Sequence, residues 1–128
     1  MQVNFNSASP VKANPAFGQI NLYAGSSYIV KRVLNPQEMD EFQKLIAKQK
    51  DSTIDLQFYS VKENSNKLRA ILLPESEFMG REKLSQKFFE GTMAFIRRCC
   101  DRADVLDACN RRATQKYIEL QSKKITEL

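Results

Sequence analysis

Strict alternation between apolar and polar residues in the stretch 52–61 constrains the fold more than any other feature of the sequence. In STIDLQFYSV every second residue is apolar (Ile54, Leu56 and Phe58), and LRAILL follows after the turn-rich stretch KENSNK. Alternate residues of a strand point to opposite faces of a sheet, so the pattern predicts a hairpin with one buried face. Pro74 ends the second strand, because proline has no N–H to donate to a neighbouring strand.

A helix is predicted directly before this hairpin, in NPQEMDEFQKLIAKQK. Asn35 is a favoured N-cap residue, Pro36 suits the first helical position, and Glu38 stands where a capping-box carboxylate reaches back. Capping and the helix dipole explain the acidic residues near this helix start, and also those at Glu75 and Glu77. These carboxylates therefore do not indicate catalysis.

A second, shorter hairpin is expected in QINLYAGSSYIVKRVL, which is rich in β-branched residues. The stretch AGSS supplies a turn, because Gly25 tolerates a positive φ. Residues 1–18 come before it and are rich in Asn, Ser, Ala and Pro, with Lys12 as their only charged side chain. We expect these residues to form a flexible N-terminal arm.

From Glu75 to the C-terminus the apolar residues recur at helical spacing. A straight helix over residues 81–124 would be about 66 Å long, whereas a domain of this size has a radius of gyration of about 14 Å. We therefore expect a break near Asp101–Asp104, with Asp104 as the N-cap of a final helix. One apolar stripe continues along that final helix; its members are Leu106, Cys109, Ala113, Tyr117 and Leu120.

Together these elements predict a single α+β domain over residues 19–128, in the order β-β-α-β-β-α-α. The sheet is expected to be antiparallel, to hold about four strands from two hairpins, and to pack against three helices. The composition, 42% apolar and 27% charged over 128 residues, suits one domain with a real core. No apolar run is long enough to cross a bilayer and the N-terminus does not look like a secretion signal, so we expect a cytoplasmic protein without membrane contact.

Histidine is absent from the chain. This excludes Ser-His and Cys-His nucleophile pairs and every zinc site that depends on histidine. The four glycines are isolated, so the chain has no Gly-rich phosphate loop. We therefore expect no catalytic residue, no metal site and no cofactor, and we keep an enzyme working through carboxylates or a cysteine as a third possibility.

The three cysteines are close together in the sequence, at Cys99, Cys100 and Cys109. Cys99 and Cys100 point about 100° apart on a helix, so one metal ion cannot bind both without distortion. We expect reduced thiols that fill the core, since cysteine is among the most often buried residues. The alternative is a reactive thiol at Cys100, because the neighbouring Arg97 and Arg98 would lower its pKa.

Basic residues are concentrated in the last third of the chain, where residues 81–128 hold eleven Lys or Arg against seven Asp or Glu. If they converge, they form a surface for the phosphate backbone of a nucleic acid. The candidate residues are Arg97, Arg98, Arg102, Arg111, Arg112 and Lys116. Solvated helix faces are the alternative, and the (i, i+4) spacing of Asp107 and Arg111 predicts an ordinary ion pair.

One face of the predicted sheet carries tyrosines near basic residues. Aromatic rings beside cations can stack on nucleic-acid bases, unless a helix or the N-terminal arm covers that face. The residues of this set are Tyr23, Tyr28, Tyr59, Arg32, Lys62 and Arg69.

The expected function is a small non-enzymatic interaction module that binds a protein partner, or a second copy of itself, through a helix face or a sheet edge. The missing catalytic residue types and the amphipathic C-terminal helices support this expectation. The alternative is a nucleic-acid-binding accessory protein that uses the basic C-terminal helices.

Overall fold

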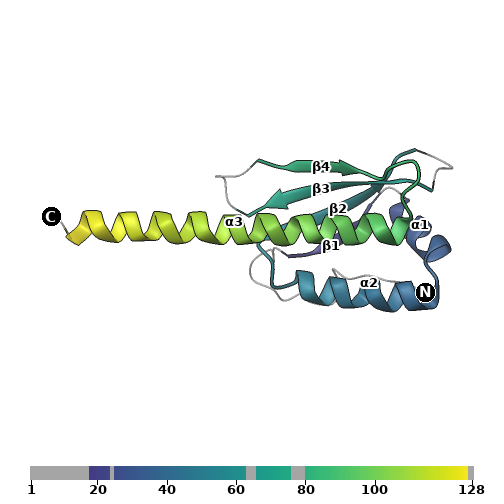
Figure 1. Cartoon of the computed structure of the whole chain (residues 1–128), viewed down its shortest axis with the longest axis horizontal. Helices are drawn as coiled ribbons and strands as arrows, with labels where there is room; N and C mark the ends of the chain where they lie inside the picture. Colours follow the sequence, from purple (N-terminus) through teal and green to yellow (C-terminus); the bar gives the residue numbers. More distant parts are fainter. Residues whose placement is uncertain (1–17, 24, 63–65, 76–79, 127–128) are drawn as a thin grey trace.

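The computed structural model describes residues 18–23, 25–62, 66–75 and 80–126. Their elements follow in the order β1 (Ile20–Leu22), α1 (Ser26–Val33), α2 (Pro36–Gln49), β2 (Ile54–Ser60), β3 (Leu68–Pro74), β4 (Glu82–Ser85) and α3 (Thr92–Thr126) (Figure 1). The described part is thus an α+β fold with a four-stranded sheet and three helices. Residues 1–17 of the predicted arm lie outside the described residues, and Gly18 is buried.

The sheet is mixed, with the strand order β1-β2-β3-β4. β2 pairs antiparallel with β3, which confirms the hairpin predicted over residues 52–73, and β4 pairs antiparallel with β3. β1 instead pairs parallel with β2, with Ile20 opposite Leu56 and Leu22 opposite Phe58. The expected antiparallel sheet and the order β-β-α-β-β-α-α are therefore wrong. Parallel neighbours need a crossover connection, which α1 and α2 provide.

The predicted second strand of the first hairpin is the helix α1. Its buried residues, Ser26, Ile29 and Val30, recur at helical spacing, and Ser26 Oγ donates a hydrogen bond of 2.9 Å to the Phe58 carbonyl oxygen. Gly25 has the positive φ of a turn residue (82°), but it precedes a helix and does not join two strands. The β-branched composition favours a strand, and the burial of one helical face outweighs that local preference.

α2 begins as the sequence predicts. Asn35 Oδ1 accepts a hydrogen bond from the Glu38 N–H at 2.8 Å, and Glu38 Oε1 accepts one from the Asn35 N–H at 3.1 Å. This reciprocal pair is a complete capping box, with Pro36 in the first turn. Phe42 and Ile46 then bury one face of the helix in the core.

The helical pattern predicted from Glu75 onward is wrong over residues 82–85, which form β4. Glu82 and Leu84 are half-buried while Lys83 and Ser85 are exposed, and this alternation is that of a strand. A short segment with few apolar residues fits both the helical spacing and the alternation of a strand. Pairing with β3 selects the strand.

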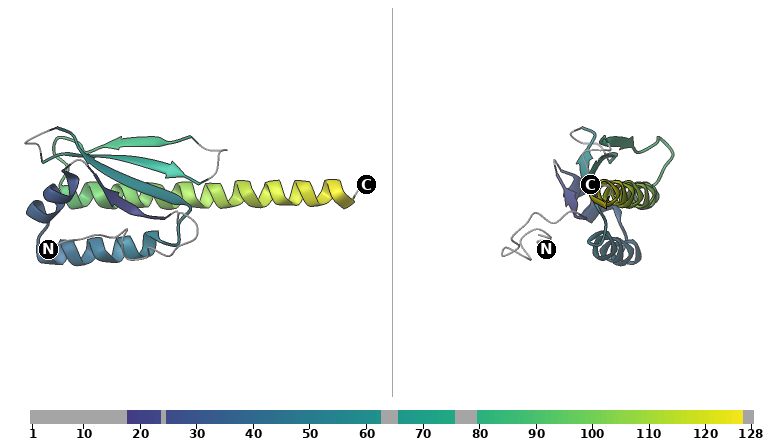
Figure 2. Two further views of the ribbon diagram at one scale, coloured as in Figure 1. Left: turned by 180° about the vertical axis from the view of Figure 1, so that it is seen from behind. Right: turned by 90° about the vertical axis from the view of Figure 1, so that its left-hand side faces the viewer.

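The break expected near Asp101–Asp104 is also wrong, because residues 92–126 form one continuous helix of 35 residues. Asp104 caps no helix; its carboxylate accepts a hydrogen bond of 3.0 Å from Lys48 Nζ of α2. A radius of gyration of about 14 Å limits the length of a helix only if the helix stays within the body of the domain. At about 1.5 Å per residue α3 is about 52 Å long, and it projects well beyond the sheet (Figures 1 and 2).

The core lies between the sheet and the helices. α2 and α3 lie side by side below one face of the sheet, and α1 lies at one end of it (Figures 1 and 2). Phe58 of β2 meets Phe95 of α3 edge to face, with 6.2 Å between ring centroids. No described helix covers the opposite face, where Asp55, Gln57 and Tyr59 are only partly buried. We call that side of the sheet the open face.

Candidate functional site

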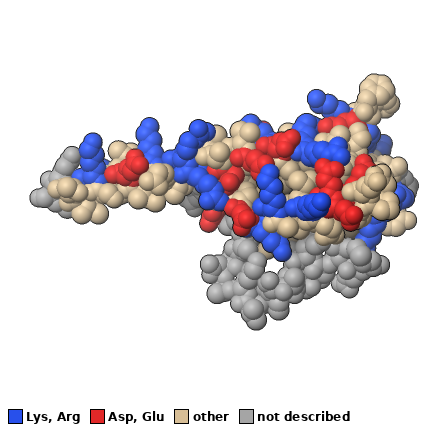
Figure 3. All heavy atoms as spheres, turned by 60° about the horizontal axis from the view of Figure 1, so that its bottom comes forward, with Lys and Arg blue, Asp and Glu red and all other residues tan. Residues whose placement is uncertain are grey.

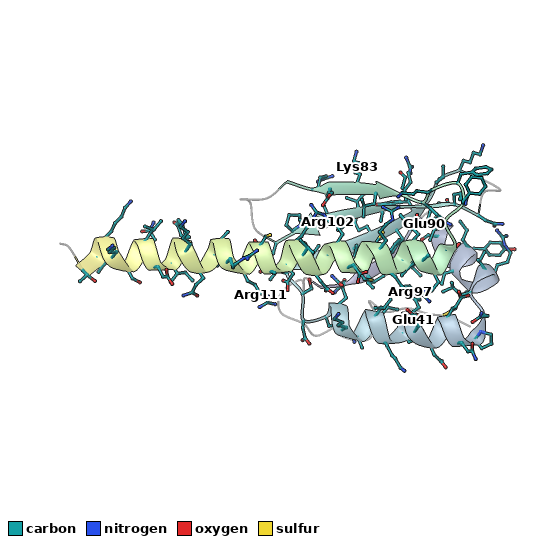
Figure 4. All side chains as sticks on the ribbon, viewed as in Figure 1. Glu41, Lys83, Glu90, Arg97, Arg102 and Arg111 are labelled. Atoms are coloured by element: carbon teal, nitrogen blue, oxygen red, sulfur yellow. The ribbon has the colours of Figure 1, made fainter. Side chains whose placement is uncertain are left out.

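Most of the predicted nucleic-acid-binding residues are bound to carboxylates of the body. Arg97 donates hydrogen bonds of 2.5 and 2.7 Å to Glu41 of α2, and Arg102 donates two of 2.9 and 3.1 Å to Glu82 of β4. Figure 4 shows Arg97 and Arg102 on opposite sides of α3. The hydrogen bond from Arg97 lowers the pKa of Glu41 and raises that of Arg97 itself. These two arginines therefore join α3 to its neighbours on either side.

Arg98 makes the least exposed ion pair among the described residues. Its Nε and Nη2 donate to the two Glu90 carboxylate oxygens at 2.8 and 2.9 Å, and Nη2 also donates to the Ser85 carbonyl oxygen at 2.8 Å. The guanidinium lies 5.2 Å from the ring centroid of Phe95. Hydrogen bonding by Arg98 lowers the pKa of Glu90. Arg98 thus fastens the start of α3 to the end of β4.

Arg111 forms the ion pair with Asp107 that the (i, i+4) spacing predicts, at 3.1 Å, and it donates a further hydrogen bond to the Asp51 carbonyl oxygen. Asp107 accepts hydrogen bonds from the Thr53 N–H and hydroxyl at 2.8 and 2.7 Å. Burial raises the pKa of Asp107, but the hydrogen bonds from Thr53 and Arg111 outweigh it, so that the net pKa is lowered. This cluster ties the middle of α3 to the turn between α2 and β2.

Arg112 and Lys116 are exposed further along α3. Arg112 donates to Cys109 Sγ at 3.5 Å, and neither cation forms an ion pair with another described residue. The six candidate residues therefore face different surroundings, namely α2, β4, the turn after α2, and solvent. The structure does not bring them together on one surface.

The cysteines behave as core residues. Cys99 and Cys100 are 0% and 5% exposed, and all three thiols are free, with Cys109 half-buried. Burial raises the pKa of Cys100 to about 12 and also raises that of Cys99. This is the opposite of the pKa shift expected from Arg97 and Arg98, whose guanidinium groups bind carboxylates outside α3.

After Arg111, which still contacts Asp51, α3 extends beyond the body, and residues 111–126 are called the tail from here on (Figures 1 and 2). The tail exposes large apolar side chains. Tyr117, Ile118, Leu120 and Ile125 have exposed fractions of 49%, 52%, 54% and 69%. Apolar side chains that gather on an exposed surface are typical of a site where another molecule binds.

The apolar stripe of the tail continues the stripe that packs α3 against the sheet. Members of this stripe are separated alternately by four and three residues, which is the spacing of a coiled-coil seam. In the body they are all buried; they are Thr92, Ile96, Cys99, Ala103, Leu106 and Asn110. In the tail the same spacing selects Ala113, Tyr117, Leu120 and Lys124. The sequence pattern places Leu106, Ala113, Tyr117 and Leu120 on one stripe but assigns them to a separate final helix, although no Gly or Pro after Gly91 marks a break.

The tail is strongly basic. It holds five cations against the single acidic residue Glu119, although Asp107 already pairs with Arg111; the cations are Arg111, Arg112, Lys116, Lys123 and Lys124. Figure 3 shows Lys and Arg along the tail, whereas acidic and basic groups are mixed on the body. The tail therefore offers a partner both an apolar stripe and positive charge.

The open face brings together part of the predicted aromatic set. Tyr23 and Tyr59 stack there with ring centroids 5.4 Å apart and ring planes inclined by 21°. Arg69 lies directly opposite Tyr59 in the register between β2 and β3. The other members lie elsewhere: Tyr28 and Arg32 stack on each other on α1, and Lys62 follows β2.

Within the described ranges, no three His, Cys, Asp or Glu side chains are placed to hold a metal ion. None of the described helices is both long and apolar enough to cross a membrane. Comparison of the chain with protein families, with curated proteins and with solved structures found no match. The tail and the open face are therefore the features from which a function can be inferred.

Proposed function

We propose that this chain is a non-enzymatic protein-binding module whose tail binds an acidic amphipathic helix of a partner protein. The observation that carries the proposal is the continuous stripe of α3, which is buried along the body and exposed along the tail. An apolar stripe on a helix is stabilised when another apolar surface removes it from water. In the body the sheet does this, and along the tail a partner helix would do the same.

The spacing of the stripe supports a helix as the partner. Alternating intervals of four and three residues keep the seam facing a second helix, so that side chains of one helix fit between those of the other. The tail is about 24 Å long, which corresponds to slightly more than two heptads. Leu120 lies in the middle of the exposed stripe. Ile118 and Ile125 are also exposed, but each follows a stripe residue by one position and so lies about 100° further around the helix, outside the stripe.

The charges of the tail favour an acidic partner over a second copy of this chain. In a parallel pair Lys124, which is a seam residue, would meet its own copy. In an antiparallel pair Lys116 of one chain would meet Lys123 of the other, because both flank the seam on the same side. Like charges across a helix pair are destabilising, whereas Glu or Asp on the partner would pair with these cations.

Two designed peptides test this proposal by fluorescence anisotropy. Each is a labelled helix of about three heptads with Leu at the seam positions, and the flanking positions carry Glu in one peptide and Lys in the other. The full chain should bind the Glu peptide at least about tenfold more tightly than the Lys peptide at about 100 mM salt. Leu120→Asp should abolish this binding, because it places a charge in the seam.

Ser122→Asp is the matched control, since it adds the same charge on the side of the tail away from the stripe. It should leave binding of the Glu peptide within about twofold of the wild type. Equal affinity for both peptides, or unchanged binding by the Leu120→Asp chain, would overturn the proposal. So would a dimer in light scattering that Leu120→Asp converts to a monomer, because the occupant would then be a second copy.

The nucleic-acid alternative has less support, because four of its six candidate cations hold carboxylates. Labelled duplex DNA and single-stranded RNA, titrated at about 50 and about 200 mM salt, test it directly. Tight binding that weakens steeply with salt and is lost in an Arg112→Ala, Lys116→Ala double variant would favour nucleic acid over a protein partner.

A further inference from the structure

A pocket of about 350 Å³ lies on the open face of the sheet, over β2, β3 and β4. None of its lining residues belongs to the tail, and the pocket is independent of the function proposed above. Its lining residues are Tyr59, Arg69, Ala70, Ile71, Lys83, Leu84 and Ser85. Figure 4 shows Lys83 on the side of β4 that faces away from α3.

The strand register explains why these side chains meet. Tyr59 is opposite Arg69, and Arg69 is opposite Ser85, so that these three form one row across the sheet. Ile71 and Lys83 are opposite each other in the next row on the same face. Neighbouring strands are about 4.8 Å apart, so groups in adjacent positions can contact one small ligand together.

The aromatic wall of the pocket is held in place before any ligand binds. Tyr59 stacks on Tyr23, with 5.4 Å between ring centroids, and its hydroxyl donates a hydrogen bond of 2.9 Å to Gln57 Oε1. A ring fixed on one side and at its tip loses little freedom when a flat ligand packs against it. Ile71 adds an apolar surface beside it.

The charge of the pocket is positive and is not neutralised by its lining. Arg69 and Lys83 are exposed, no carboxylate lines the pocket, and neither cation forms an ion pair with another described residue. Arg98 and Arg102, in contrast, are both held by glutamates. Arg69 and Lys83 are thus available to bind an anion, and the Ser85 hydroxyl can donate a hydrogen bond to it.

We propose that this pocket binds a small organic anion with a flat ring, such as a nucleoside monophosphate or an aromatic carboxylate. Arg69 and Lys83 hold the anionic group, while Tyr59 and Ile71 pack against the ring. The volume is at the lower end of the roughly 300–1,000 Å³ range of ligand pockets, which fits one ring system with one charged group.

NMR titration of the full chain with four probes tests this site. The probes are adenosine monophosphate, indole-3-carboxylate, neutral adenosine and inorganic phosphate. Amide signals of β3 and β4 should shift with at least one of the two aromatic anions, and that anion should bind about tenfold or more tightly than adenosine or phosphate alone. A preference between phosphate and carboxylate then identifies the class of the natural ligand.

Arg69→Ala and Lys83→Ala should each weaken binding of the preferred anion by about tenfold. Arg112→Ala and Lys44→Ala remove equally exposed cations outside the pocket and serve as matched controls. Phosphate binding as tightly as the aromatic anions would overturn the proposal, because the ring would contribute nothing. The absence of shifts in β3 and β4 at about 5 mM of both aromatic anions would overturn it as well.

Discussion

Arg98 and Glu90 are joined by two hydrogen bonds of 2.8 and 2.9 Å at the junction where the chain leaves β4 and enters α3. Glu90 also accepts a hydrogen bond from the Lys87 N–H at 3.0 Å, and its carbonyl oxygen accepts one from Gln86 Nε2 at 2.7 Å. The junction is thus held by an arginine from within the helix. This arrangement fixes the direction in which α3 runs along the sheet.

Removal of this arginine is expected to destabilise the fold. Arg98→Ala leaves the largely buried Glu90 carboxylate without its cation and removes the contact with Phe95, so the free energy of unfolding should fall by about 1–3 kcal/mol. Urea denaturation measures this change. Arg112→Ala, which breaks no ion pair, should stay within about 0.5 kcal/mol of the wild type. Similar losses in both variants would show that the Arg98 pair is not structural.

The stabilisation from Glu90 should depend on pH. Its pKa is lowered in the folded state, so the ionised form contributes stability above the ordinary value of 4.5, and that contribution is lost as the pH falls through the lowered pKa. Glu90→Gln should therefore be less stable than the wild type at pH 7, and the two should converge in acid. Thermal unfolding at a series of pH values checks this, and a gap that stays constant down to about pH 2 would contradict it.

The ionised form of Asp55 should lower the stability of the fold, whereas that of Glu90 raises it. Burial raises its pKa, although its Oδ1 accepts a hydrogen bond of 2.9 Å from the Gln19 N–H. The ionised form is therefore unfavourable in the folded state, and this penalty grows as the pH rises through the ordinary value of 3.8 and above. Asp55→Asn keeps an acceptor for Gln19 without the charge. It should be more stable than the wild type at pH 7 and no more stable near pH 3, by the same unfolding series.

The three thiols should react with Ellman's reagent at different rates. In the native protein Cys109 should react first, because it is half-buried while Cys99 and Cys100 lie in the core with raised pKa values. Denaturant should release all three thiols. Cys109→Ser should remove the fast reaction of the native protein, and a fast phase that persists in that variant would instead place a reactive thiol in the core.

Hydrogen exchange should divide α3 into two parts. Amides of residues 96–110 are packed against the sheet and should exchange only through opening of the fold, whereas amides of the tail should exchange orders of magnitude faster. A chain that ends at Arg112 should keep the unfolding free energy of the full chain within about 0.5 kcal/mol. Strong protection of the tail in the isolated monomer would contradict this division.

Patterns within short stretches of the sequence correctly predicted the elements whose formation depends on neighbouring residues. The alternation of Ile54, Leu56 and Phe58 predicted β2, and the Asn35 and Glu38 capping box predicted the start of α2. Both rest on neighbours in the sequence. The parallel partner of β1 could not be found in this way, because Ile20 meets Leu56 only after two helices intervene.

The candidate site was predicted in part. The stripe through Leu106 and Leu120 follows from spacing alone, but its exposure depends on where the body ends, which no local pattern records. The count of charged residues likewise selected Arg98 and Arg102 as candidate nucleic-acid-binding residues but did not reveal the glutamates that bind them. Glu82, for example, lies on β4, twenty residues before Arg102. The sequence suggested that Tyr23 and Tyr59 share a face of the sheet, but their stacking depends on the parallel pairing of β1 with β2 and was not predicted.

Because α3 passes from the body into the tail without interruption, the body provides the helical turns from which the tail extends. Starting a helix is the unfavourable step, since several residues must be fixed for one hydrogen bond, whereas each further residue adds a bond of its own. The tail joins turns that the sheet already holds and avoids that step. A separate peptide with the sequence of residues 111–126 would have to nucleate by itself. The same side chains should therefore bind a partner more tightly when they are attached to the domain than when they are cut from it.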